Sequence, residues 1–404
     1  METPIVPDED YSKTASRNGS YAGLQAAVFL VVAAAFTTIY ITQPVLPVIQ
    51  TEFGVDETRA SLTISAVVLG IALANLPFGM VSDRFPIRPI ILFGGSVITV
   101  CGLLCAYTHS LPLLVAARFL QGLFVPSLTT CLAAYLARSL PAERLNVVMG
   151  SYVSATVAGG LGGRLLGGWI HPPLHWRYAF VSASAFLFVS TLLAAHRLKG
   201  DALGAEPART NAGFRYLLSR PDLVRTFMVS FGSFFVFSSI FNYLPFYLAG
   251  PPFNASTHVI TMLYLTYVVG IVTGPLAGRL SNRLGNGAAM TLGSVVFAMA
   301  IGATLIKSLL AVVLSLAGVC AGFFTIHSSA AGSLNRKLKT SRGRANSLYV
   351  LFYYLGGYAG ITLSGYAYLH AGWPGVAGLG WAMLCIPFFT GIVEARSAGS
   401  GQST

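Results

Sequence analysis

Long apolar runs with hardly any charge recur along the whole chain, and this feature constrains the fold more than any other. Charged residues make up 9% of the sequence, whereas soluble domains carry roughly 25%. So little polar material cannot cover the surface of a chain this long in water. A helix that crosses a membrane needs about 20 consecutive, mostly apolar residues. The sequence therefore predicts an all-α membrane protein and excludes soluble, disordered and collagen-like classes.

Twelve such runs can be placed, with short connections between most of them. They lie near residues 24–47, 60–82, 89–108, 112–137, 146–170, 177–196, 224–249, 258–279, 288–306, 309–333, 345–370 and 372–395. All five cysteines fall inside these runs, which favours small core residues over disulfides or metal ligands. We therefore expect no metal centre.

The positions of Lys and Arg predict the orientation in the membrane. With an even number of spans and the N-terminus inside, the cytoplasmic segments hold 20 of the 25 Lys and Arg, and the outer segments hold only Arg59, Arg177 and Lys307. Both termini are therefore expected in the cytoplasm of a bacterial inner membrane. The net charge of +12 then faces anionic lipid. No nucleic-acid partner is expected, because the basic residues are scattered over short loops.

The two halves of the chain resemble each other at an offset of 199 to 200 residues. GMVSDR at 79–84 matches GRLSNR at 278–283, and QGLF at 121–124 matches AGFF at 321–324. Such a repeat predicts two pseudo-symmetric six-helix bundles with a site between them near the membrane midplane. The expected organisation is a cytoplasmic tail at 1–22, bundles at 23–196 and 224–395, a cytoplasmic linker at 197–223 and a tail at 396–404.

Three motifs resemble those of the major facilitator superfamily. The loop from Gly79 to Arg88 resembles its G-x-L-a-D-r-x-G-r-[RK] motif, and Arg118 with Gln121 resembles its fourth-helix motif. Arg164 stands where the antiporter motif of the fifth helix has proline, although every glycine of that helix-packing motif is present: Gly150, Gly159, Gly163, Gly167 and Gly168. Further stretches resemble the YnfM-type branch, close to the arabinose-efflux-like permeases. The resemblance implies a monomeric secondary transporter that works by alternating access.

The same resemblance implies a gating latch on the cytoplasmic side. Its residues would be Gly79, Asp83, Arg84 and Arg88, with Gly278, Asn282 and Arg283 in the second half. Asp83 would face the N-terminus of the eleventh span, where a helix dipole favours a carboxylate and Asn346 would be the N-cap. Asp83→Asn should then weaken the outward-open state. The alternative is a loop charge that only sets topology.

Arg118 and Arg164 are the only Lys or Arg expected inside spans, and no carboxylate is expected there. An ionisable residue at this depth is a functional candidate. Two guanidinium groups would suit an anionic or zwitterionic solute, because Arg binds carboxylate and phosphate through two parallel hydrogen bonds. The alternative is a local structural role, in which each caps backbone carbonyls or binds amides and hydroxyls.

Several polar and aromatic residues are candidates for a substrate cavity. Gln121 belongs to this set, His327 is the candidate for proton coupling, and Tyr353 and Tyr354 could form an aromatic wall. Others lie shortly before a proline in each half: Tyr40 and Gln43, and Asn242 and Tyr243. For all of these residues the alternative interpretation is a place in the packed core. Trp176 is expected to anchor an interfacial turn.

The sequence thus favours proton-coupled export of a small organic solute, with the proton gradient as driving force and no bound cofactor. Uptake of an organic anion or nutrient by symport or uniport is the alternative. Two weaker hypotheses are a soft-metal site at His258 and Met262 and a membrane sensor without transport activity. No ATP-binding loop occurs in the chain, and no enzymatic activity is expected.

Overall fold

The computed structural model describes residues 9–198, 213–338 and 341–400, and these residues are helical with short connections and no strand. The elements are α1 (Glu9–Tyr40), η1 (Gln43–Val45), α2 (Leu46–Phe53), α3 (Glu57–Val81), α4 (Ile87–Tyr107), α5 (Leu111–Leu128), α6 (Thr130–Ser139), α7 (Ala142–Ile170), α8 (Arg177–Arg197), α9 (Phe214–Ser219), α10 (Pro221–Ala249), α11 (Thr257–Leu263), η2 (Tyr264–Thr266), α12 (Tyr267–Leu284), α13 (Asn286–Ala303), α14 (Leu309–Arg336) and α15 (Arg342–Ser400).

Ten helical stretches of the described chain are long and apolar enough to cross a membrane, against the twelve runs expected. One difference arises at α15, which consists of two helices that meet at Gly372, where the backbone adopts φ 60°. Glycine alone takes this conformation readily. The other difference is that α7 is not among the ten. It has the length of a span, but its many glycines and Arg164 lower its hydrophobicity.

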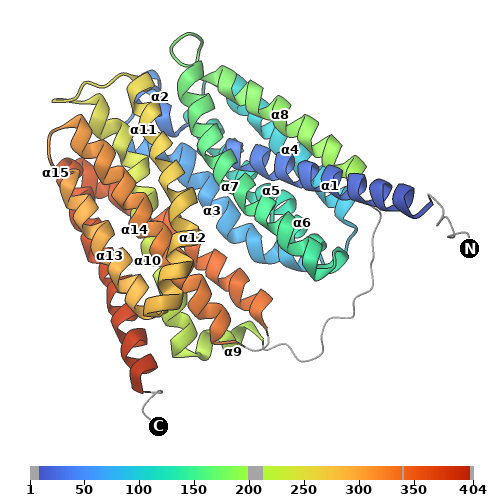
Figure 1. Cartoon of the computed structure of the whole chain (residues 1–404). Helices are drawn as coiled ribbons and strands as arrows, with labels where there is room; N and C mark the ends of the chain where they lie inside the picture. Colours follow the sequence, from blue (N-terminus) through green and yellow to red (C-terminus); the bar gives the residue numbers. More distant parts are fainter. Residues whose placement is uncertain (1–8, 199–212, 339–340, 401–404) are drawn as a thin grey trace, which may run out of the picture.

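The helices form two groups that follow the order of the chain (Figure 1). One contains α1 to α8, with α1 against α7, α3 against α5 and α4 against α8; the other contains α9 to α15, with α10 against α15 and α13 against α14. Contacts of α3 with α15 and of α7 with α11 join the groups. We call the side where α1 begins and α15 ends the terminal side, and the opposite one the far side.

The expected tails and linker differ from the observed helix ends. α1 begins at Glu9, within the stretch assigned to the N-terminal tail, and α15 extends to Ser400, into the C-terminal one. The linker contains α9, while 199–212 lie outside the described residues. Helical hydrogen bonding therefore continues beyond the apolar runs that marked the spans.

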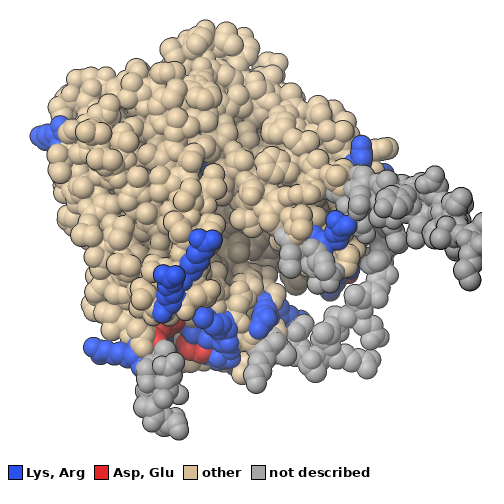
Figure 2. Space-filling model, viewed as in Figure 1, with Lys and Arg blue, Asp and Glu red and all other residues tan. Residues whose placement is uncertain are grey.

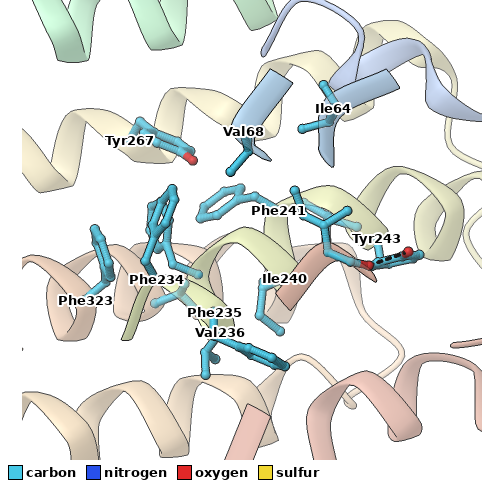
Figure 3. Close-up of a cluster of buried hydrophobic side chains, with 14 of the residues drawn as sticks. Ile64, Val68, Phe234, Phe235, Val236, Ile240, Phe241, Tyr243, Tyr267 and Phe323 are labelled. Atoms are coloured by element: carbon cyan, nitrogen blue, oxygen red, sulfur yellow. Dashed lines mark hydrogen bonds between the residues drawn. The ribbon is translucent and has the colours of Figure 1, made fainter. Parts of the chain in front are cut away.

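A hydrophobic cluster crosses from one group to the other. Ile64 and Val68 of α3 pack with the aromatic side chains of α10, among them Phe234 and Phe241 (Figure 3). A second cluster lies within α1 to α8. The ring of Phe237 stacks on Phe323 of α14 with centroids 4.0 Å apart. This packing places an aromatic core directly beside the interface between the two groups.

Glycines on α7 allow the backbone of α1 to approach closely. A Cβ atom at Gly159 or Gly163 would lie 2.2 Å from the carbonyl oxygen of Ala33 or Thr37, respectively, and one at Gly167 would lie 1.9 Å from that of Ile41. These glycines recur every four residues and thus lie on one helix face.

The other two glycines of the antiporter-like motif have different surroundings. Gly168 faces Thr261 of α11 across the two groups, with its ideal Cβ position 1.8 Å from the hydroxyl oxygen. Gly150 has open space around its Cβ position, so a packing role for it is wrong in this structure. It lies near the start of α7 on an exposed face.

Candidate functional site

A cavity of about 1280 Å³ lies between the two helix groups and opens to the terminal side. It is lined by residues of α1, α3, α6 and α7 of the first group and of α9, α14 and α15 of the second, together with residues of the connections between them. In Figure 2 the recess lies near the middle of the face, and Lys and Arg gather below it. Ligand sites of transporters built from repeats lie in this place, at the interface of the halves.

Aromatic side chains dominate the inner end of the cavity. Phe36 of α1, Tyr152 of α7, and Tyr353 and Tyr354 of α15 line it, with His327 of α14. The Nδ1 atom of His327 lies 3.1 Å from the hydroxyl of Tyr349, and its ring stacks on Phe323 with centroids 5.8 Å apart. Tyr354 is 12 residues from the start of α15, about 18 Å into the helix.

The mouth of the cavity carries charge. Asp83 accepts a hydrogen bond of 2.7 Å from Arg138 at the end of α6, which also donates to the carbonyl of Ser82. The Asp83 side chain is 70% exposed. It pairs within its own half here, because the halves are apart on this side.

The other latch candidates are distributed as follows. Gly79 and Arg84 line the cavity, whereas Arg88, Asn282 and Arg283 are exposed and Gly278 is half-buried. Asn346 lies inside α15, which begins four residues earlier, and donates to Asn335 at 3.2 Å. Its expected role as N-cap is therefore wrong.

Arg164 closes the far side. Its guanidinium donates to Gln43 at 2.7 Å and to the hydroxyl of Tyr267 at 2.8 Å. The ring centroids of Tyr40 and Tyr267 lie 4.0 and 4.3 Å from its central carbon. The side chain is 2% exposed. Since Tyr267 belongs to α12 and the other partners to the first half, Arg164 holds the two halves together.

A second polar contact joins the halves nearby. Asn242 of α10 donates to Ser61 of α3 at 2.8 Å, and both are buried. Tyr243 instead donates to the carbonyl of Ile361 within its own half (Figure 3). Tyr40, Gln43, Asn242 and Tyr243 thus do not line this cavity. The four were expected to do so, but in this conformation they pack or seal the far side.

Arg118 has a structural role. It is fully buried and donates to the carbonyls of Thr38, Ile39 and Thr63 and to Gln121. Two of these carbonyls belong to the last turn of α1, which ends at Tyr40 and leaves them without helical partners. The chain turns there and enters η1, where Pro44 has no N–H to donate.

Three residues that were expected to line the cavity therefore lie outside it. Arg118 and Gln121 lie outside the cavity, and Gln121 also donates to the carbonyl of Ile98 at 3.0 Å. Arg164 lies outside it as well. Both guanidinium groups donate to neutral oxygens of the described chain. In this conformation both arginines therefore have the local structural role that was the alternative to solute binding.

Two ion pairs were not expected from the sequence. Glu394 lies within the last span and pairs with Lys337, so the expected absence of carboxylates from spans is wrong. On the far side, Glu52 pairs with Arg177 and accepts from the indole of Trp176. Trp176 is 1% exposed and therefore no interfacial anchor. In both cases a partner distant in sequence makes burial possible.

Sequence reasoning also missed cavity and far-side residues. Asn75, Tyr152 and Phe36 line the cavity, and Ser61 and Tyr267 seal the far side. Asn75 and Tyr152 are polar residues within spans, which is a signal that could have found them. Ser61 carries no such signal, because serine is common where membrane helices pack.

The comparisons with known proteins agree with this architecture. A model of the Major Facilitator Superfamily matches residues 28–335. The chain belongs to this superfamily. The inner membrane transport protein YnfM of Escherichia coli is 29% identical over 371 residues, which cover 90% of this chain and 88% of YnfM. The MFS-type transporter YybF of Bacillus subtilis is 28% identical over 375 residues, or 90% and 91%.

Other members of the superfamily are more distant. The multi-drug resistance efflux pump PmrA of Streptococcus pneumoniae is 24% identical over 266 residues, which cover 62% of this chain and 64% of PmrA. The fold matches the crystal structure of a bacterial homologue of the human lysosomal transporter Spinster, with a TM-score of 0.75, 15% identity, and coverage of 93% and 97%. The chain is thus a membrane transporter of the superfamily and not an enzyme.

Proposed function

We propose that the protein is a secondary transporter of a small organic solute that works by alternating access. One observation carries this proposal: the cavity between the halves is open on the terminal side and sealed on the far side by contacts between the halves. A ligand in the cavity can reach only one side. The crystal structure of the Spinster homologue is in an inward-facing and unoccupied conformation, and we assign the inward-facing state to this structure too.

We assign the terminal side to the cytoplasm. Arg84, Arg138, Arg342 and Arg344 line the mouth of the cavity, where Asp83 is the one acid among the lining residues described. An excess of Arg and Lys marks the cytoplasmic ends of bacterial membrane helices. Both termini would then lie inside the cell.

We further propose export driven by the proton gradient. Among the described lining residues, His327 alone is of a residue type that takes up and releases protons near neutral pH when free in water. The likeness to the efflux pump PmrA supports export. Uptake of an organic anion is the second candidate, favoured by the arginines at the mouth, since their positive potential attracts an anionic solute.

Accessibility of two single cysteines tests alternating access. Cys385 is the exposed cysteine, so Cys385→Ala gives a background in which the other four are buried. Thr156→Cys reports on the cavity, and Thr261→Cys reports on the sealed far side. A maleimide that does not cross membranes should label position 156 from the cytoplasm and position 261 slowly from outside. A proton gradient should change the two rates in opposite directions; independent rates would contradict the proposal.

A further inference from the structure

The inner end of the cavity offers fixed aromatic faces. The ring of Tyr353 stacks on Phe234 with centroids 3.7 Å apart and planes inclined by 12°, and Tyr354 lies edge-on to Tyr353 at 5.3 Å. Phe36 and Tyr152 complete the wall from the first half. Rings held in this way can stack against a planar solute, because aromatic pairs favour offset or edge-to-face arrangements.

Among the described residues no acid lines this end, and a buried positive charge lies behind it, outside the cavity. The one carboxylate among the described lining residues is Asp83 at the mouth, and it binds Arg138. Phe36 is one helical turn from Tyr40, about 6 Å along α1, and the guanidinium of Arg164 lies 4.0 Å from the Tyr40 ring. Within the described chain Arg164 has no ion-pair partner. A buried unpaired charge produces a positive potential in a low-dielectric cavity nearby.

Hydrogen-bond donors face this space. The Oδ1 atom of Asn75 accepts from Thr130 at 2.6 Å, so the amide nitrogen is the group left for a ligand. Among the described residues no hydrogen bond is made by Nε2 of His327 or by the hydroxyls of Tyr353 and Tyr354. Amide and hydroxyl donors suit a carboxylate, which accepts hydrogen bonds only.

We propose that this end of the cavity binds a planar aromatic carboxylate, an inference that rests on the proposed transport function and adds the chemical class of its solute. The ring lies between the side chains of Tyr353, Tyr354 and Tyr152. The carboxylate accepts hydrogen bonds from the donors that line the cavity, within the positive potential of Arg164 behind Tyr40. A lipophilic cation would meet no acid here, and a sugar would find few polar partners for its hydroxyls.

Binding of small probes to the full chain in lipid nanodiscs tests this assignment by calorimetry. Benzoate is the probe, benzamide is its neutral counterpart, and cyclohexanecarboxylate is the acid without an aromatic ring. Benzoate should bind at least about tenfold more tightly than either, because benzamide lacks the charge and cyclohexanecarboxylate lacks the aromatic ring; a tenfold difference corresponds to about 1.4 kcal/mol. Equal binding of either counterpart, tighter binding of tetraphenylphosphonium or of a pentose, or no benzoate binding would overturn it.

Variants locate the site. Tyr354→Leu should weaken benzoate binding about 2- to 10-fold, since a stacking partner is lost. Tyr366→Leu is the matched control on the same helix, because Tyr366 is 56% exposed and lies outside the cavity; it should leave the affinity unchanged. Arg164→Gln should reduce the preference for benzoate over benzamide. An unchanged preference in that variant, or equal losses in both tyrosine variants, would contradict the assignment.

The two proposals fail in different ways. If Thr156→Cys and Thr261→Cys label reciprocally but benzoate has no advantage over its counterparts, the solute class is wrong and alternating access stands. If benzoate binds as expected but labelling is not reciprocal, the cavity is a binding site in a protein that does not alternate.

Discussion

Arg164 of α7 donates a hydrogen bond of 2.8 Å to the hydroxyl of Tyr267 of α12, and this contact joins the two halves at the sealed end of the cavity. The guanidinium stacks on the same tyrosine ring and on Tyr40. Gln43 accepts a further hydrogen bond from the Nε atom. The contact therefore stabilises the conformation in which the terminal side is open.

Removal of the hydroxyl should destabilise the far-side seal. Tyr267→Phe keeps the ring but leaves one N–H of Arg164 without its partner, which costs about 1.5–3 kcal/mol for a bond to a charged group. Labelling of Thr261→Cys from outside should rise at least about tenfold. Tyr366→Phe, on the exposed face of α15, is the control. Equal labelling in the two variants would show that the bond does not hold the seal.

Glycine substitutions on α7 should have unequal effects. Gly163→Ala places a Cβ 2.2 Å from the carbonyl oxygen of Thr37, so α1 must move or the helix must distort. Overpacking of this kind costs about 1–3 kcal/mol or more. Gly150→Ala meets open space and should retain the melting temperature. Thermal denaturation of the two variants in detergent, followed by size-exclusion chromatography, compares them; equal melting temperatures would contradict the packing role.

Arg118 should be needed for folding rather than for solute selection. Arg118→Lys loses the planar fork that reaches Thr38, Ile39 and Thr63, and the carbonyls left behind lose their partner. We expect a loss of about 3 kcal/mol or more, measured as a lower melting temperature. Arg59→Lys, whose side chain is 69% exposed, is the control. A stable Arg118→Lys protein with altered benzoate affinity would point to solute contact instead.

Asp83 should affect the conformational equilibrium more than the stability. In this state it makes an exposed ion pair with Arg138, and such pairs contribute about 0–1 kcal/mol. Asp83→Asn should therefore melt close to the parent protein. If Asp83 latches the halves when the terminal side closes, the variant favours the open cavity and Thr156→Cys labels faster. Unchanged labelling and transport would leave Asp83 as a loop charge.

The sequence predicted those features that depend on local pattern. Apolar runs indicated the helices, and glycines four residues apart on α7 indicated a packing face, which contacts α1. The structural role of Arg118 depends on where α1 ends, and the nearby Pro44 was a usable signal for that. The partners of Arg164 and Asn242 come from the opposite half. They depend on how the halves are placed, which no local pattern determines.

Buried charge was the least predictable feature for the same reason. Glu394 lies at the end of the last apolar run and has Lys337 as its partner, 57 residues earlier. Glu52 and Arg177 are 125 residues apart. Pairing compensates the loss of hydration, but the partner can be recognised only once the helices are assembled.

Distances across both ends of the molecule test alternation of the two halves most directly. Spin labels at Ser139→Cys and Ser347→Cys span the mouth of the cavity, and labels at Ser110→Cys and Lys307→Cys span the far side. We would compare each pair by electron paramagnetic resonance, in the Cys385→Ala background, with and without Arg164→Gln. We predict that Arg164→Gln shortens the distance across the mouth and lengthens the one across the far side. No change in either pair, or a change of the same sign in both, would contradict alternation about the Arg164 seal.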